Sequence, residues 1–207
     1  MRTAAWLLLG GLLAFGFGAA IPVRWLEVWF SGLERHLELI SQHRRSWAWL
    51  NGFMIAAVLL TAAGFSVMAA QLGHPALVAA AATFAIGSVM WILVASYRTT
   101  TSVWVADQMS ETSRVPEVFK ALDAWTGRWF QIYIATAYGS EIAVGVGLLS
   151  GTVVPSWVCI FTIGFGLAGF LSVLPGFSRL PVLSGVFEVP ILVHVAPAII
   201  GVALLLR

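Results

Sequence analysis

Cysteine is almost absent from this chain of 207 residues. Its one cysteine, Cys159, lies inside an apolar stretch. A single sulfur excludes an intramolecular disulfide and a thiolate metal cluster. The sequence also lacks a phosphate-binding glycine loop, a nucleophile elbow and a zinc-protease helix motif. An enzyme is therefore the least supported class, and we expect neither catalytic residues nor a resident metal.

Charged residues are also scarce. They make up 10% of the chain, whereas an ordinary soluble domain carries about 25%. No segment is both long enough and polar enough to form a separate soluble domain, so we interpret residues 1–207 as a single integral membrane domain. The net charge of +2 is too small to indicate binding to nucleic acid.

Apolar residues fill six long stretches, which hold more than half of the chain. Each is close to the ~17–25 residues that an α-helix needs to cross ~30 Å of hydrocarbon. A backbone in lipid has to satisfy its own hydrogen bonds, so such stretches become helices. The sequence therefore predicts an all-α membrane protein, a polytopic bundle of about six transmembrane helices. The expected spans are residues 4–21, 50–72, 76–97, 129–150, 157–174 and 190–206.

The basic residues are unevenly distributed among the connections between these spans. Nine lie in the first, third and fifth connections, and the other two are Arg2 and Arg207. An even number of spans puts those three connections on one side, and the positive-inside rule makes that side the cytoplasm. We expect a protein of the inner (cytoplasmic) membrane with long basic loops in the cytoplasm and both termini outside. The arginines that follow the first span favour a retained helix over a cleaved signal peptide.

Two of the basic connections have the three- and four-residue apolar spacing of an amphipathic helix. The first pattern lies in Arg24–His43, and the second runs from Val115 to Trp129. We expect two amphipathic interfacial helices on the cytoplasmic surface. They either pack on the bundle or form a docking surface for a partner.

Glu141 is an acidic residue deep inside a predicted span. It lies ~18 Å of helix rise from Trp129, which is close to the middle of the bilayer. An acid at that depth is costly and is by default a functional-site hypothesis. Matching depths predict Thr61 and Ser88 as neighbours, and Tyr138 lies three residues away on the same face. Glu141 is either a hydrogen-bonded structural acid or a ligand or proton site.

The histidines provide a second set of candidate site residues. His36 and His43 are seven residues apart on the first interfacial helix, and His194 is predicted near the cytoplasmic end of the sixth span. A b-type haem needs two imidazoles that meet at one depth, and only His194 with His36 or His43 can supply them. A chlorin pigment needs one axial ligand, for which His194 is the candidate. The alternative is a histidine that only packs within the bundle.

Several segments of the second half are similar in sequence to segments of other proteins. They are Tyr133–Gly151, Val154–Trp157 with the glycine-rich stretch after it, Glu188–Pro190 and Pro197–Leu206. Together with Leu39–Trp47, these segments resemble bacterial multi-span proteins that are grouped only as domains of unknown function. The resemblance implies a compact six-helix membrane protein and supplies no catalytic residues.

Three functions are compatible with these features. The first is a non-catalytic accessory or scaffold subunit of a larger membrane complex, in contact with lipid, quinone or pigment through faces of small residues. The second is a small-molecule or proton-coupled transporter with a water-accessible cavity at Glu141. The third is a haem-binding electron-transfer subunit. The expected partners are the lipid bilayer and other membrane protein subunits. Pigment, quinone and haem b stay alternatives, because the sequence requires no cofactor.

Overall fold

The computed structural model describes residues 1–20, 31–112, 114–174 and 186–207. These residues form helices and no strand, which confirms the all-α prediction for the part of the chain described. The helices are α1 (Arg2–Ala20), α3 (Leu33–Gln42), α4 (Arg44–Leu72), α5 (Pro75–Thr112), α6 (Glu117–Leu149), α7 (Ser156–Ser172), the 3-10 helix η1 (Pro190–His194) and α9 (Val195–Leu205).

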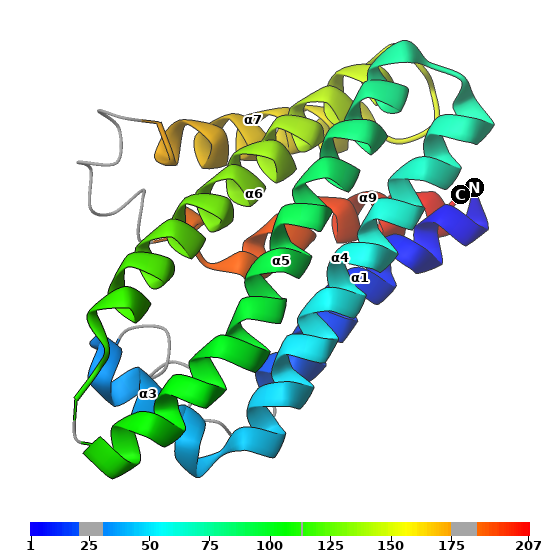
Figure 1. Ribbon diagram of the computed structural model, residues 1–207. Helices are drawn as coiled ribbons and strands as arrows, with labels where there is room; N and C mark the ends of the chain where they lie inside the picture. Colours follow the sequence, from blue (N-terminus) through cyan, green and yellow to red (C-terminus); the bar gives the residue numbers. More distant parts are fainter. Residues whose placement is uncertain (21–30, 113, 175–185) are drawn as a thin grey trace.

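The long helices run side by side, and each is antiparallel to its neighbour along the chain (Figure 1). α4 packs between α1 and α5, α6 packs between α5 and α7, and α9 returns against α1. One end of the bundle carries both ends of the chain (Figure 1) together with Thr152, which accepts from Arg207, and the α4–α5 connection at Gly73, and we call it the terminal end. The opposite end carries α3, and we call it the α3 end.

Three helices, α4, α5 and α6, are long and apolar enough to cross a membrane. Their 29, 38 and 33 residues correspond to ~44, ~57 and ~50 Å of rise, compared with ~30 Å of hydrocarbon. α1, α7 and the η1–α9 segment are apolar but shorter. The structure thus supplies three candidate spans, and the number of six stays a prediction.

The second predicted interfacial helix is not a separate element. α6 begins at Glu117, directly after Pro116, and continues without a break through Trp129 to Leu149. Gly127 lies inside this helix, but one glycine costs a helix only about 1 kcal/mol and does not end it. The prediction of a surface helix over Val115–Trp129 is therefore wrong, because nothing in that stretch separates it from the span.

The first amphipathic pattern forms a helix over its described part. α3 buries Leu37, Leu39 and Ile40 and lies against α5. Glu34 and Glu38 are exposed on its other face. Residues 24–30 of the predicted helix lie outside the described residues. The apolar face of α3 is thus covered by its own bundle.

Glycines allow α6 and α7 to approach closely. A Cβ atom at Gly166 would lie 2.9 Å from the carbonyl oxygen of Tyr138, and one at Gly145 would lie 2.9 Å from that of Cys159. Contacts of this kind need residues without side chains at the crossing. The close α6–α7 pair fixes one wall of the bundle interior.

Candidate functional site

The sixth apolar segment is not one continuous α-helix. Residues 190–194 form the 3-10 helix η1, and the α-helical part begins only at Val195. Pro197 cannot donate a backbone hydrogen bond, but it falls in the first turn of α9, where that donor has no intrahelical partner in any helix. The predicted span over residues 190–206 is therefore broken, and its α-helical part has 11 residues.

His194 ends η1 and is fully buried. Its Nδ1 lies 2.9 Å from the hydroxyl oxygen of Thr61, which is near the middle of α4. Its ring packs on Phe15 of α1 with ring centroids 5.4 Å apart. The predicted position of His194 near an end of the span is therefore wrong, because η1 ends at the level of Thr61, near the middle of α4.

Tyr138 connects α6 to the segment that leads into η1. Its hydroxyl donates a 3.0 Å hydrogen bond to the carbonyl oxygen of Phe187. Its ring covers Gly169 of α7, where a Cβ atom would lie 2.5 Å from the ring. Residues 186–194 thus cross the bundle interior, from α6 and α7 at Phe187 to α1 and α4 at His194. Irregular backbone at membrane depth is tolerated where protein surrounds it.

Glu141 has a fully buried carboxyl group. Neither of its oxygen atoms has a hydrogen-bond partner among the residues that the structure describes. On the same helix, Thr136 and Gly147 face α5, whereas Ile142 and Gly145 face α7. A rotation of ~100° per residue places Glu141 between these two faces. Its side chain therefore points into the bundle interior.

The register of the helices places Glu141 relative to His194. Three contacts align α4, α5 and α6: Gly87 with Thr136, Leu77 with Gly147, and Phe65 with Phe84. In this register, Glu141 lies about one and a half turns, or ~8 Å, nearer to the terminal end than Thr61. The two buried polar groups thus occupy the same interior at different levels. The Nε2 atom of His194 also lacks a partner within the described ranges.

The residues predicted to surround Glu141 bind other groups. Tyr138 donates to Phe187, Thr61 bonds to His194, and the Ser88 hydroxyl donates to the carbonyl of Phe84 in its own helix. Sequence reasoning missed the Thr61–His194 contact. Hydropathy carried no signal for it, because an apolar run does not distinguish a 3-10 helix from an α-helix. Glu141 lines neither the polar cavity nor the apolar groove that the next two paragraphs describe.

His36 and His43 lie at the α3 end. The His36 ring contacts the edge of Trp47, with centroids 5.4 Å apart. His36 also lines a polar cavity of about 230 Å³ between α3, α5 and α6. Trp47 precedes Thr61 by fourteen residues of α4, which is ~21 Å of rise. The structure therefore does not bring His194 together with His36 or His43, and the two-imidazole haem site is not formed.

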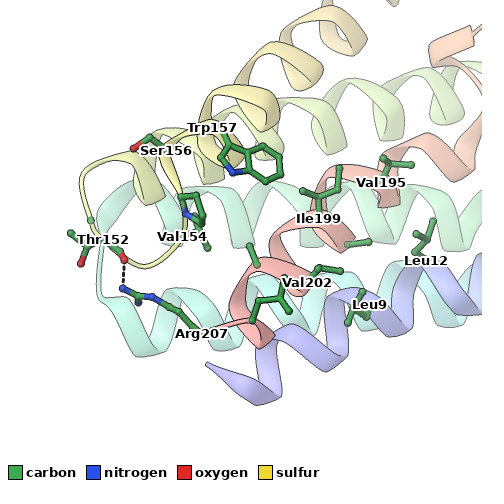
Figure 2. Close-up of a pocket in the computed structure, with 15 residues that line it drawn as sticks. Leu9, Leu12, Thr152, Val154, Ser156, Trp157, Val195, Ile199, Val202 and Arg207 are labelled. Atoms are coloured by element: carbon green, nitrogen blue, oxygen red, sulfur yellow. Dashed lines mark hydrogen bonds between the residues drawn. The ribbon is translucent and has the colours of Figure 1, made fainter.

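A lateral groove of about 950 Å³ lies between α1, α9 and the start of α7 (Figure 2). It extends along α9 from Val195, the residue after His194, to Arg207. At its mouth the Arg207 guanidinium donates to the carbonyl oxygen of Thr152. Its apolar walls are formed by Leu9, Leu12, Val154, Trp157, Ala198, Ile199, Val202, Ala203 and Leu206. The sequence did not predict this groove, because its walls come from segments far apart in the chain.

Metal ligands do not gather anywhere in the described part of the chain: no three histidine, cysteine, aspartate or glutamate residues there are placed to hold an ion. No protein-family model, no curated protein and no solved structure matches the chain. The resemblance of its second half to bacterial multi-span proteins therefore stays a prediction. The function has to be argued from the groove and the buried polar groups.

Proposed function

We propose that this chain is a non-catalytic, multi-pass integral membrane protein, an accessory or scaffold subunit that holds a lipid-like molecule in the groove between α1, α7 and α9. The observation that carries the proposal is the groove itself. Its volume of about 950 Å³ lies at the upper end of the ~300–1,000 Å³ typical of ligand sites. Its walls are mainly apolar, with Thr152, Ser156 and Arg207 at one end, and its lining residues Trp157, Val202 and Leu206 are exposed at the surface of the bundle.

Exposed tryptophans support a membrane position. Trp49 at the α3 end and Trp6 at the terminal end are both more than 60% exposed. Leu8 packs against Gly64, which places Trp6 level with residue 66 of α4. Along α4, Trp49 and residue 66 are separated by ~26 Å of rise. This distance is close to the ~30 Å thickness of the hydrocarbon core. Tryptophans at this spacing suit the two membrane–water interfaces.

Apolar side chains on the outer faces agree with this position. Val78, Ile86 and Leu93 of α5 and Ile160 of α7 are all exposed. In water such a surface would promote association, whereas in lipid it needs no partner. We propose six crossings: α1 and α7 join α4, α5 and α6, and the return of the chain to the terminal end is the sixth, of which α9 covers the half toward that end. By the positive-inside rule, the α3 end lies in the cytoplasm of an inner-membrane protein.

Native mass spectrometry of the protein purified in a mild detergent tests the groove. We expect the wild type to retain a lipid-like mass and Ile199→Trp, which fills the groove, to lose it. Ile160→Trp, at an exposed position of α7 that does not line the groove, is the matched control and should retain the mass. A wild type without any retained lipid-like mass would contradict the proposal. Polypeptides that co-purify would identify the complex.

A second candidate function is a proton-coupled carrier with Glu141 at its site. It is favoured by the two unpartnered carboxyl oxygens of a fully buried acid. Proteoliposomes loaded with a pH-sensitive dye, under an imposed membrane potential, test it. The carrier function predicts proton entry with the wild type and none with Glu141→Gln. If protons enter the vesicles with wild-type protein no faster than those with Glu141→Gln, this function is excluded.

A further inference from the structure

We propose that the groove binds one anionic phospholipid from the leaflet at the terminal end, with an acyl chain along α9 and the phosphate at Arg207. This inference rests on the function proposed above and names its ligand. The length of the groove, the shape of its closed end and the charge at its mouth each contribute to the argument.

The groove has the length of one leaflet. Its lining follows α9 from Val195 to Leu206, a rise of ~17 Å. A leaflet with its headgroups is about 20–22 Å thick. Gly201 packs on Ala5, so Trp6 is level with residue 200 of α9. The part of the groove from Val195 to that level would hold acyl chain, and the part from there to Arg207 lies at headgroup level.

The closed end of the groove favours an acyl chain over a helix of a partner. Leu12 and Val195 line the groove at its deep end, and beyond them the ring of Phe15 packs on buried His194. A transmembrane helix is ~10–12 Å wide with side chains and continues for the full ~30 Å. A groove that ends about halfway through the bundle cannot guide such a helix. A single acyl chain, which also ends halfway, matches it.

The mouth of the groove is suited to a phosphate. Arg207 presents a planar guanidinium there, a group that recognises phosphate with two parallel hydrogen bonds. α7, a helix of 17 residues, begins at Ser156 on the opposite wall, and no side chain caps its first turn. The Val158 N–H donates to the carbonyl oxygen of Pro155, which leaves the N–H groups of Ser156 and Trp157 to attract an anion. Figure 2 shows Arg207, Ser156 and Trp157 around this mouth.

The charged side chains near the mouth have the sign that an anionic headgroup needs. Gly201 packs on Ala5, so Arg2 and Arg207 lie at the same end of the bundle. The aspartates and glutamates of the described residues lie in α3, in the parts of α5 and α6 toward the α3 end, at Glu141, and at Glu188. None of them lines the groove. Trp157 is 62% exposed at the mouth, as expected for a ring at headgroup level.

Lipid titration of the delipidated protein, followed by native mass spectrometry, tests the inference. The probes are phosphatidylglycerol and phosphatidylcholine with identical acyl chains. We expect the wild type to bind phosphatidylglycerol about fivefold more tightly, which is the effect of one basic residue near a membrane surface. Arg207→Gln should remove this preference while both lipids still bind. Arg2→Gln, which removes the same charge from the same end outside the groove, should keep the preference.

The outcomes separate the two proposals. If the wild type binds both lipids equally well, the headgroup assignment is overturned and the lipid-holding function survives. If neither lipid binds, or if Ile199→Trp releases a co-purifying polypeptide instead of a lipid, both proposals fail. Ile160→Trp should behave as the wild type in each assay, and a loss of binding in that control would overturn the location in the groove.

Discussion

At the scale of single residues, the interior holds polar groups with and without partners. Thr61 and His194 bond to each other at 2.9 Å, and the Thr162 hydroxyl donates to a carbonyl of its own helix. The carboxyl group of Glu141 has no partner among the described residues. An unpartnered buried polar group costs about 1–3 kcal/mol. Substitutions at Glu141 and Thr61 therefore measure what each buried polar group contributes to stability.

Thr61→Val should lower the free energy of unfolding by about 1–3 kcal/mol, because it leaves Nδ1 of His194 without its partner. Thr162→Val is the matched control: Thr162 is equally buried, but its hydroxyl donates within its own helix. We expect the control to change stability by less than about 1 kcal/mol. Denaturant unfolding in detergent measures both variants. Equal losses would show that the Thr61–His194 contact carries no special stability.

Glu141→Met should raise the free energy of unfolding by about 1–3 kcal/mol, because it removes an unsatisfied buried carboxyl group and keeps most of its volume. Leu148→Met, on the same helix and also buried, should change stability by less than about 1.5 kcal/mol. The same unfolding assay applies. A clear loss of stability in Glu141→Met would mean that the carboxyl group is a structural acid.

At the scale of elements, the apolar runs located the long helices but not their ends. Hydropathy marks only the apolar part of a helix. The predicted span therefore ended at Tyr97, whereas α5 continues to Thr112. Beyond the apolar part, Asp107 of α5 pairs with Arg44 of α4, so charged residues fit these helix extensions. Hydropathy did not predict the 3-10 helix η1, because its residues are as apolar as those of α9.

Gly166→Ala should destabilise the α6–α7 pair by about 1–3 kcal/mol, because its Cβ atom would lie 2.9 Å from a backbone oxygen of Tyr138 that cannot move aside. Gly164→Ala lies on the same helix and meets no atom within 4 Å. That variant should be neutral or stabilising by up to about 1 kcal/mol, because alanine favours the helix. Similar effects of both substitutions on thermal unfolding would contradict the close crossing.

At the scale of the whole molecule, the sequence predicted part of the candidate site. The burial of Glu141 followed from its place in an apolar run, and the structure has it fully buried. The positions of His194 and of the groove did not follow, because each depends on how segments distant in the chain meet. Helix register within one run is readable from spacing, whereas contacts between α1, α7 and α9 are not.

The two ends of the bundle differ in charge in a way that bears on orientation. The α3 end holds the acidic residues of α3, α5 and the start of α6 together with basic partners, as in the Lys120–Glu117 and Arg35–Glu38 pairs. The terminal end has Arg2 and Arg207. A lipid bound at the terminal end from one leaflet requires the two ends of the bundle to face opposite sides of one membrane.

Labelling of single cysteines in sealed vesicles of both orientations tests that requirement most directly. Cys159 is first replaced by alanine, and a cysteine is then placed at Ser110, near the α3 end, or at Thr152, at the terminal end. We expect a membrane-impermeant reagent to label Thr152→Cys only from the outside and Ser110→Cys only from the cytoplasmic side. Labelling of both positions from the same side would contradict the bundle that crosses the membrane between them.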